Sequence, residues 1–231
     1  MNNNNKIFKY MIVFTKNKER YNNFFEIKKE IIELEMFEAY DSINNLDSCL
    51  QINKLYNLNT DEYINQWVSK KIFGKIGCNI SHFMLLKMIL NNNKIDNDDW
   101  ILILEDDITV KKYDEKIINN LCNKANDVNS KFIHLCISKK FMEKQFNKKN
   151  LIDENIYKMI PQWSTTAFLI KKSMVNFLFN NLPCDCNVDI FFNRYIYLLN
   201  GLVFKNNIFS NMGSENSNDV DTKFGSLIWN K

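Results

Sequence analysis

Trp100-Ile101-Leu102-Ile103-Leu104-Glu105-Asp106-Asp107-Ile108 is the most informative stretch of this sequence. Five apolar residues follow the polar residues 97–99, which is typical of a strand buried on both faces of a parallel sheet that helices cover. Three carboxylates come directly after this run. Because like charges about 4 Å apart repel by roughly 1 kcal/mol even in water, we expect a cation or a proton to be held between them.

The three carboxylates form a candidate metal site. Side chains alternate along a strand, so Glu105 and Asp107 should face one side and Asp106 the other. A pair of oxygen ligands with open positions suits Mg²⁺ or Mn²⁺ that bridges to phosphates, and open α/β sheets bind ligands at the carboxyl ends of their strands. A solvated turn, or an N-cap of the next helix, is the alternative. We favour a metal-assisted nucleotide site.

Length and composition indicate one ordinary globular unit. The 231 residues fit a single α/β domain, which we expect to span residues 9–231, with residues 1–8 disordered or weakly ordered. Hydrophobic residues at 45% and charged residues at 25% are values of soluble globular proteins. A net charge of +3 is a near balance, which does not favour a nucleic-acid or membrane partner.

The expected location is the cytoplasm. No apolar run approaches the ~18 residues that a membrane span needs, and the amino terminus lacks a secretory pattern. Most of the six cysteines lie in apolar runs, as buried thiols of a reducing compartment do, although a disulfide is not excluded. Frequent Asn, Lys and Ile indicate an AT-rich coding sequence, and for a viral source the location would be the host cytoplasm.

The amino-terminal third predicts a βαβ unit. Residues 9–14 form an apolar run, residues 22–35 show helical periodicity, and residues 36–40 form a second apolar run. This order predicts parallel strands and a right-handed crossover, with the polar loop after the first strand lying over the ligand edge. Thr15 and Arg20 of this loop are candidate ligand-binding residues. Arg20 either supports a diphosphate or pairs with Glu19 or another nearby acid.

Further elements are expected along the rest of the chain. They are an irregular segment at 44–59, a helix from residue 60, a buried helix after residues 74–77, an amphipathic helix at 111–126, strands at 132–137 and 163–170, a charged loop at 139–155, a helix from about 173 and a late strand within 202–209. His134 lies inside an expected strand, and we predict that it is a core histidine.

Gly74-Lys75-Ile76-Gly77-Cys78-Asn79-Ile80-Ser81-His82 is a second notable stretch, because the chain has only 5 glycines. Glycines that lead into a buried helix leave backbone N–H donors for a ligand, which makes Gly77 and Ser81 candidate binding residues. Close packing of the helix against a strand is the alternative. His82 is either a hydrogen-bonded structural residue or a ligand-binding one, and the structural interpretation is favoured.

Asp189 is a further candidate. It lies in the apolar run 188–192 at the expected start of a helix. An acid at this position either interacts with the helix dipole in the first turn or faces the cleft as a general base, and the sequence leaves both possibilities open.

Together these stretches resemble glycosyltransferase family 25, the lipooligosaccharide and procollagen-type galactosyltransferases. The stretch 74–82 is similar to the family's Gly-Glu-Ile-Gly-Cys-x-x-Ser-His, with Lys75 in place of Glu, and residues 103–108 are similar to its Ile-Leu-Glu-Asp-Asp-Val. Residues 14–20, 37–41, 166–173 and 188–189 occur in the expected order. The resemblance runs from about Lys9 to Ile228, in a chain that is short for the family.

The resemblance implies a GT-A-type, Rossmann-like α/β fold with a mostly parallel sheet. It also implies a UDP-sugar donor, a divalent metal ion (Mn²⁺ or Mg²⁺) and inversion at the anomeric carbon. Glu105 and Asp107 would then bind the metal, Asp106 would reach the ribose or complete the metal shell, and Asp189 would be the base. Thr15, Arg20, Gly77, Ser81 and His82 would contact the donor. The acceptor would be a hydroxyl of a glycan, a lipid-linked saccharide or a protein, and the sugar galactose or glucose.

Two other function classes compete with this interpretation. A catalytically weak or inactive nucleotide-sugar-binding module, which acts as a partner subunit in a glycosylation complex, would fit the short chain, but the intact triplet at 105–107 argues against it. A metal-dependent phosphohydrolase would also cluster acids, but it should show more His or Asp ligands.

Overall fold

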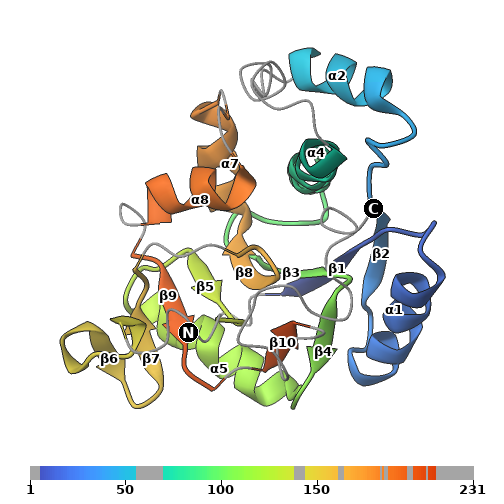
Figure 1. Cartoon of the computed structure of the whole chain (residues 1–231). Helices are drawn as coiled ribbons and strands as arrows, with labels where there is room; N and C mark the ends of the chain where they lie inside the picture. Colours follow the sequence, from blue (N-terminus) through green and yellow to red (C-terminus); the bar gives the residue numbers. More distant parts are fainter. Residues whose placement is uncertain are drawn as a thin grey trace.

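The computed structural model describes residues 6–55, 70–137, 144–160, 164–182, 184, 187–196, 200–206 and 208–211. In this part of the chain an eight-stranded sheet has the order β2-β1-β3-β8-β5-β9-β7-β6, and β4 pairs separately with β10 (Figure 1). The strands are β1 (Ile7–Val13), β2 (Glu35–Glu38), β3 (Trp100–Glu105), β4 (Ile108–Val110), β5 (Phe132–His134), β6 (Leu151–Asp153), β7 (Ile156–Lys158), β8 (Ala167–Lys171), β9 (Leu202–Phe204) and β10 (Phe209–Asn211). The helices are α1 (Lys18–Glu30), α2 (Leu46–Leu55), α4 (Lys70–Asn91), α5 (Glu115–Asp127), α7 (Lys172–Asn180), α8 (Val188–Ile196) and the short 3₁₀ helix η1 (Lys148–Asn150).

The predicted α/β fold with a mostly parallel sheet is confirmed. β1 is parallel to both β2 and β3, and β5 is parallel to β9. β8 lies between β3 and β5 and is antiparallel to both, and β7 is antiparallel to β9 and β6. β8 and β7 thus run opposite to the other strands of this sheet, which all share one direction. The edge that carries the acidic triplet is therefore formed by the carboxyl ends of β2, β1 and β3, as the βαβ start predicts.

Helices cover both faces of the sheet. One core contains residues of α4, α7 and α8, and the other contains residues of α1 and α5 (Figure 1). β3 contributes to both, because Ile101 and Ile103 pack in the first core and Trp100, Leu102 and Leu104 in the second. All five are fully buried, which confirms the interpretation of the apolar run as a strand buried on two faces.

Several element boundaries differ from those predicted. β1 begins at Ile7, which pairs with Trp100, two residues before the expected start. α1 begins at Lys18 rather than near residue 22, because Asn17 accepts the N–H groups of Glu19 and Arg20 and caps the helix earlier. α5 begins after its own cap at Asp114. The expected late strand is divided between β9 and β10.

Other segments were wrongly predicted to be irregular. Residues 46–55, within the segment expected to be irregular, form α2. The expected charged loop at 139–155 contains η1 and β6, which pairs with β7. The expected helix start at residues 60–62 lies outside the described residues.

Candidate active site

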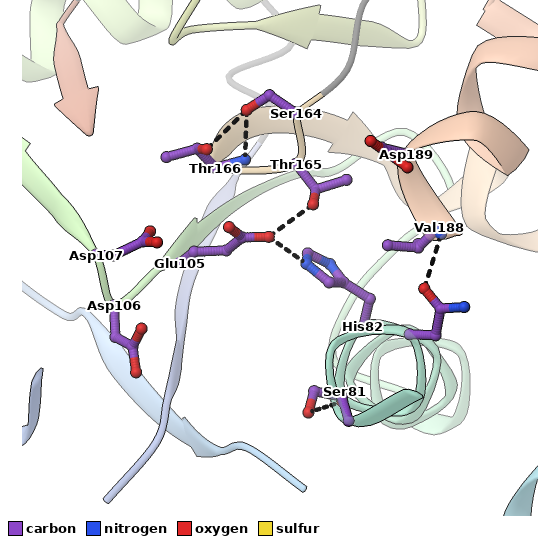
Figure 2. Close-up of polar contacts among 12 residues, drawn as sticks. Ser81, His82, Glu105, Asp106, Asp107, Ser164, Thr165, Thr166, Val188 and Asp189 are labelled. Carbon is purple, nitrogen blue, oxygen red and sulfur yellow. Dashed lines mark hydrogen bonds and ion pairs between the residues drawn. The ribbon is translucent and has the colours of Figure 1, made fainter. Parts of the chain in front are cut away.

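The end of β3 directs its three carboxylates to different surroundings. Side chains alternate between the two faces of the sheet along β3. Glu105 is on the same face as Ile101 and Ile103 and points to the α4 side, whereas Asp106 is on the same face as Leu104 and points to the α1 side. In Figure 2 the Glu105 carboxylate faces His82 and Thr165, and the Asp106 carboxylate points away from the other two acids. The separation of Asp106 from Glu105 therefore follows the strand alternation that the sequence predicts.

Glu105 is held by two donors. His82 Nε2 lies 2.9 Å and Thr165 Oγ1 lies 2.6 Å from its Oε1 atom (Figure 2). Within the described part of the chain Oε2 has no hydrogen-bond partner, so one oxygen is fixed and the other is available to the cleft. Burial acts to raise the pKa of Glu105, but the hydrogen bond and charge of His82, the Thr165 hydroxyl and the Arg20 charge outweigh it and lower the pKa. Glu105 is thus an anion with a defined orientation.

Both carboxylate oxygens of Asp106 accept hydrogen bonds from other residues of the protein. Oδ2 accepts the backbone N–H of Phe14 at 2.6 Å, and Oδ1 accepts Arg20 Nη1 at 2.6 Å. The Asn23 side chain also donates to the Asp106 carbonyl. Burial raises the pKa of Asp106, while the Arg20 charge and the Phe14 N–H oppose the shift. Asp106 thereby ties the end of β1 and the start of α1 to the end of β3.

Asp107 has the least compensated charge of the triplet. Its Oδ1 atom is buried and has no hydrogen-bond partner among the described residues, and its Oδ2 atom lies 3.9 Å from Arg20 Nη2. Burial and the neighbouring Glu105 charge raise the pKa of Asp107 to about 7, against the opposing effect of Arg20. A buried acceptor without a donor is costly. A cation or a proton at Asp107 would therefore stabilise the site.

Arg20 lies between the two aspartates. Its side chain is 14% exposed and pairs with Asp106 and, more distantly, with Asp107. Of the alternatives that the sequence left open, an ion pair with a nearby acid is the one observed, although the pair is buried rather than exposed. A diphosphate contact stays a prediction.

Gly77 and Ser81 fasten α4 to the loop after β2. A Cβ atom on Gly77 would lie 2.7 Å from the Tyr40 carbonyl oxygen and 2.8 Å from Ser42 Oγ. Ser81 Oγ accepts the Tyr40 N–H at 2.8 Å and donates to the Gly77 carbonyl at 2.6 Å. Because α4 begins at Lys70, the prediction that the glycines precede the helix is wrong. Gly77 packs closely, but against the loop after β2 and not against a strand as the alternative interpretation expected. Ligand binding by Gly77 and Ser81 stays a prediction.

Asp189 and Thr15 occupy the edges of this region. Asp189 lies in the first turn of α8, where its Oδ1 atom accepts the Ile190 N–H at 2.8 Å. Burial and the Glu105 charge raise the pKa of Asp189 against that hydrogen bond. Thr15 donates to Glu38 at 2.7 Å in an exposed position.

A cleft joins Arg20, the acidic triplet and α4, whereas Asp189, Thr15 and Thr165 are not among its lining residues. Its lining comes from the end of β1, Arg20 of α1, residues 39–43, one face of α4 and residues 105–107. The sequence analysis missed Cys78 as a lining residue and Thr165 as a partner of Glu105. The polar run at residues 164–166 before a buried strand was the available signal for Thr165. Cys78 gave no signal apart from its place between Gly77 and Ser81.

The second histidine is a core residue, as predicted. His134 is fully buried, with Nε2 3.0 Å from the Ser164 carbonyl and Nδ1 accepting the Cys136 N–H. Burial lowers the pKa of His134 to about 4, so it is neutral at pH 7. Among the described cysteines, Cys49, Cys78 and Cys122 are free thiols.

The family model described as glycosyltransferase family 25 (LPS biosynthesis protein) matches residues 6–192. The chain belongs to glycosyltransferase family 25. The match extends from the start of β1 into α8 and includes the acidic triplet, the 74–82 stretch and Asp189. A search of curated proteins found no significant match.

Family 25 membership assigns the chain a glycosyltransferase role, with a nucleotide-sugar donor and a glycan acceptor as the family's substrate classes. The cleft agrees with this role, since it lies at the carboxyl ends of β1 and β3, where open α/β sheets bind ligands. None of the described helices is long and apolar enough to cross a membrane.

Proposed function

We propose that this family 25 member transfers a hexose, galactose or glucose, from a UDP-sugar to a hydroxyl group with inversion, and that a divalent metal ion is required. The observation that carries this proposal is the buried, unpartnered Oδ1 atom of Asp107 beside the anionic Glu105. A single domain over residues 9–231 would provide the whole site, with the acceptor a glycan, a lipid-linked saccharide or a protein.

The acidic residues fit a hard divalent cation such as Mn²⁺ or Mg²⁺. Asp107 Oδ1 has no donor, and Glu105 Oε2 is left unused when His82 and Thr165 occupy Oε1. Both atoms are carboxylate oxygens, which these ions prefer. When bound, the metal would neutralise charge on the donor diphosphate and on the leaving nucleotide.

Other groups of the cleft, and Asp189 beyond its lining, have matching roles. Arg20, fixed by Asp106, places a permanent positive charge at the mouth of the acidic site, where a diphosphate would bind. Residues 39–43 and the Gly77 face of α4 form a wall against which a nucleoside would pack. Asp189 is the proposed base, because its raised pKa makes it a better proton acceptor than an ordinary aspartate.

The test is UDP release from a panel of UDP-sugars with Mn²⁺, with and without a chelator. We expect turnover that the chelator abolishes and that Asp107→Asn, which keeps the size but removes the charge, lowers by about 100-fold or more. Asp98→Asn is the matched control, because Asp98 is 83% exposed at the opposite end of β3. Equal turnover of wild type and Asp107→Asn would refute the metal role of Asp107.

A nucleotide-sugar-binding module without activity is the second candidate. It predicts UDP-sugar binding by calorimetry, with Mn²⁺ present, but no UDP release with any donor or acceptor. Turnover above the Asp107→Asn background would exclude it.

A further inference from the structure

A second set of metal-ligating side chains overlaps the acidic site. Cys78 and His82 are one turn apart on α4, and Glu105 lies opposite them at the end of β3. One ligand atom from each of these residues lies within 4.8 Å of the other two. No other group of this kind occurs in the described part of the chain.

The donor atoms of this set differ from those of the Glu105 and Asp107 pair. Cys78 offers a sulfur, His82 a ring nitrogen and Glu105 a carboxylate oxygen. Mg²⁺ and Mn²⁺ favour oxygen-only surroundings, whereas Zn²⁺ is bound by thiolate, imidazole and carboxylate, with an open fourth position in sites that have three protein ligands.

The two α4 side chains are suited to ligation. His82 is 1% exposed, and its Nδ1 atom is buried without a hydrogen-bond partner among the described residues. Its Nε2 atom lies 2.9 Å from Glu105 Oε1, so a bound ion would replace this hydrogen bond and widen the separation to about 3.4 Å. Cys78 is a free, half-buried thiol that lines the cleft, so an ion can reach it from solvent.

The electrostatic field of the cleft also favours a cation. Burial raises the pKa of Cys78 well above its usual value, and the charges of Glu105, Asp189 and Asp107 raise it further. The same negative charges that disfavour a free thiolate attract a dication, and a coordinating metal ion deprotonates a thiol outright.

We propose that Cys78, His82 and Glu105 form a site for a soft divalent cation of the Zn²⁺ type, with its fourth position open to the cleft. Binding forms a sulfur–metal bond, and the thiol proton of Cys78 passes to solvent. Because Glu105 belongs to both sets, this ion and the hard cation of the proposed transferase site exclude each other. That consequence rests on the proposed function, whereas the binding itself does not.

The binding test uses Co²⁺ as a spectroscopic probe of the full-length chain. A thiolate ligand gives an intense near-ultraviolet sulfur-to-cobalt band, which we expect at one equivalent in wild type and which Zn²⁺ should abolish by displacement. Cys78→Ala should lose the band. Cys122→Ala, which removes a buried thiol of the other core, should retain it. No band in wild type, or a band that persists in Cys78→Ala, would overturn the proposal.

Alkylation of wild type provides a measurement that does not depend on folding of a variant. One equivalent of Zn²⁺ should slow the reaction of Cys78 with iodoacetamide at least tenfold, as read by peptide mass spectrometry. An unchanged rate would argue against a sulfur–metal bond.

Electron paramagnetic resonance of bound Mn²⁺ tests the shared ligand. Zn²⁺ should release Mn²⁺ from wild type but not from Cys78→Ala. If Mn²⁺ stays bound while the cobalt band forms, the shared role of Glu105 is refuted. If no Mn²⁺ binds at all while the cobalt band forms, the metal requirement of the proposed function fails and the soft site stands.

Discussion

Glu105 takes its orientation from donors that lie far from it in the sequence. His82 belongs to α4 and Thr165 to the segment before β8, and both bond to the same oxygen. The Oε2 atom is left for a ligand. In a metal site, losing a partner that orients a ligand typically lowers metal affinity about 10–100-fold, so Thr165 is a positioning residue for Glu105.

Replacing Thr165 with Val should therefore weaken Mn²⁺ binding. The side chain keeps its shape but loses the hydroxyl 2.6 Å from Glu105, and we expect the Mn²⁺ dissociation constant to rise by about tenfold. Titration followed by electron paramagnetic resonance measures it. Thr165→Ser retains the hydroxyl and should stay close to wild type. A similar loss in both variants would indicate a packing effect rather than loss of the hydrogen bond.

The proposed role of Asp189 as the base is tested by measuring UDP-sugar binding and sugar transfer separately. Asp189→Asn should bind UDP-sugar with nearly the wild-type dissociation constant and transfer the sugar at least about 100-fold more slowly, because an amide cannot accept the acceptor's proton. Calorimetry and UDP release give the two quantities. Asp47→Asn, in the first turn of α2, is the control for a first-turn acid. If transfer by Asp189→Asn is unchanged, Asp189 is a helix-dipole partner only.

Among the elements, α4 packs directly against the loop that lines the cleft. Gly77 lies against the Tyr40 carbonyl, and Ser81 bonds the Tyr40 N–H, so the helix backbone and the loop after β2 are in direct contact. Asn79 of the same helix accepts the Val188 N–H at 2.8 Å. α4 thus links the proposed nucleoside wall with the start of α8.

Gly77→Ala should destabilise the protein, although alanine favours a helix by about 1 kcal/mol over glycine. Its Cβ would lie 2.7 Å from a backbone oxygen, so the helix or the loop must move, at a typical overpacking cost of about 1–3 kcal/mol. Urea unfolding should show a net loss, and UDP affinity should fall because Tyr40 and Ser42 line the cleft. Increased stability with unchanged UDP affinity would contradict this account.

Elements with long apolar runs could be predicted from the sequence, whereas short ones could not. β3 is fully apolar before its acids, and the α4 apolar pattern identified a buried helix. β6 and β7 are three-residue strands among charged residues, and three residues are too few to show the alternation of apolar and polar side chains that identifies a strand. The start of α1 depends on Asn17, which a sequence rich in Asn does not distinguish from other Asn residues.

At the scale of the whole molecule, the arrangement of the site depends on contacts that no local pattern encodes. Alternation along β3 predicted that Glu105 and Asp106 diverge. It could not predict that Asp106 would be saturated by Phe14 and Arg20, since β1 and β3 are adjacent only in the folded sheet. The Thr165 contact likewise requires β8 to pair antiparallel with β3.

The same sheet buries His134, and this gives the stability of the whole protein a pH dependence. β5 carries His134 into the interior, where burial lowers its pKa to about 4 from an ordinary 6.5. Between these values the unfolded chain binds a proton that the folded chain does not. Stability from this residue is therefore fully present above pH 6.5 and is lost progressively as the pH falls toward 4.

From pH 7 to pH 5 His134 should lower the free energy of unfolding by about 2 kcal/mol. Urea unfolding at the two pH values measures the change, and His134→Gln provides the comparison because its amide does not titrate. The variant starts less stable, since Gln cannot reproduce both the Ser164 and Cys136 contacts. The decisive quantity is the change in the free energy of unfolding between pH 7 and pH 5, which should be about 2 kcal/mol smaller in the variant than in wild type. Equal changes in the two proteins would mean that His134 is protonated as readily in the folded protein as in the unfolded chain.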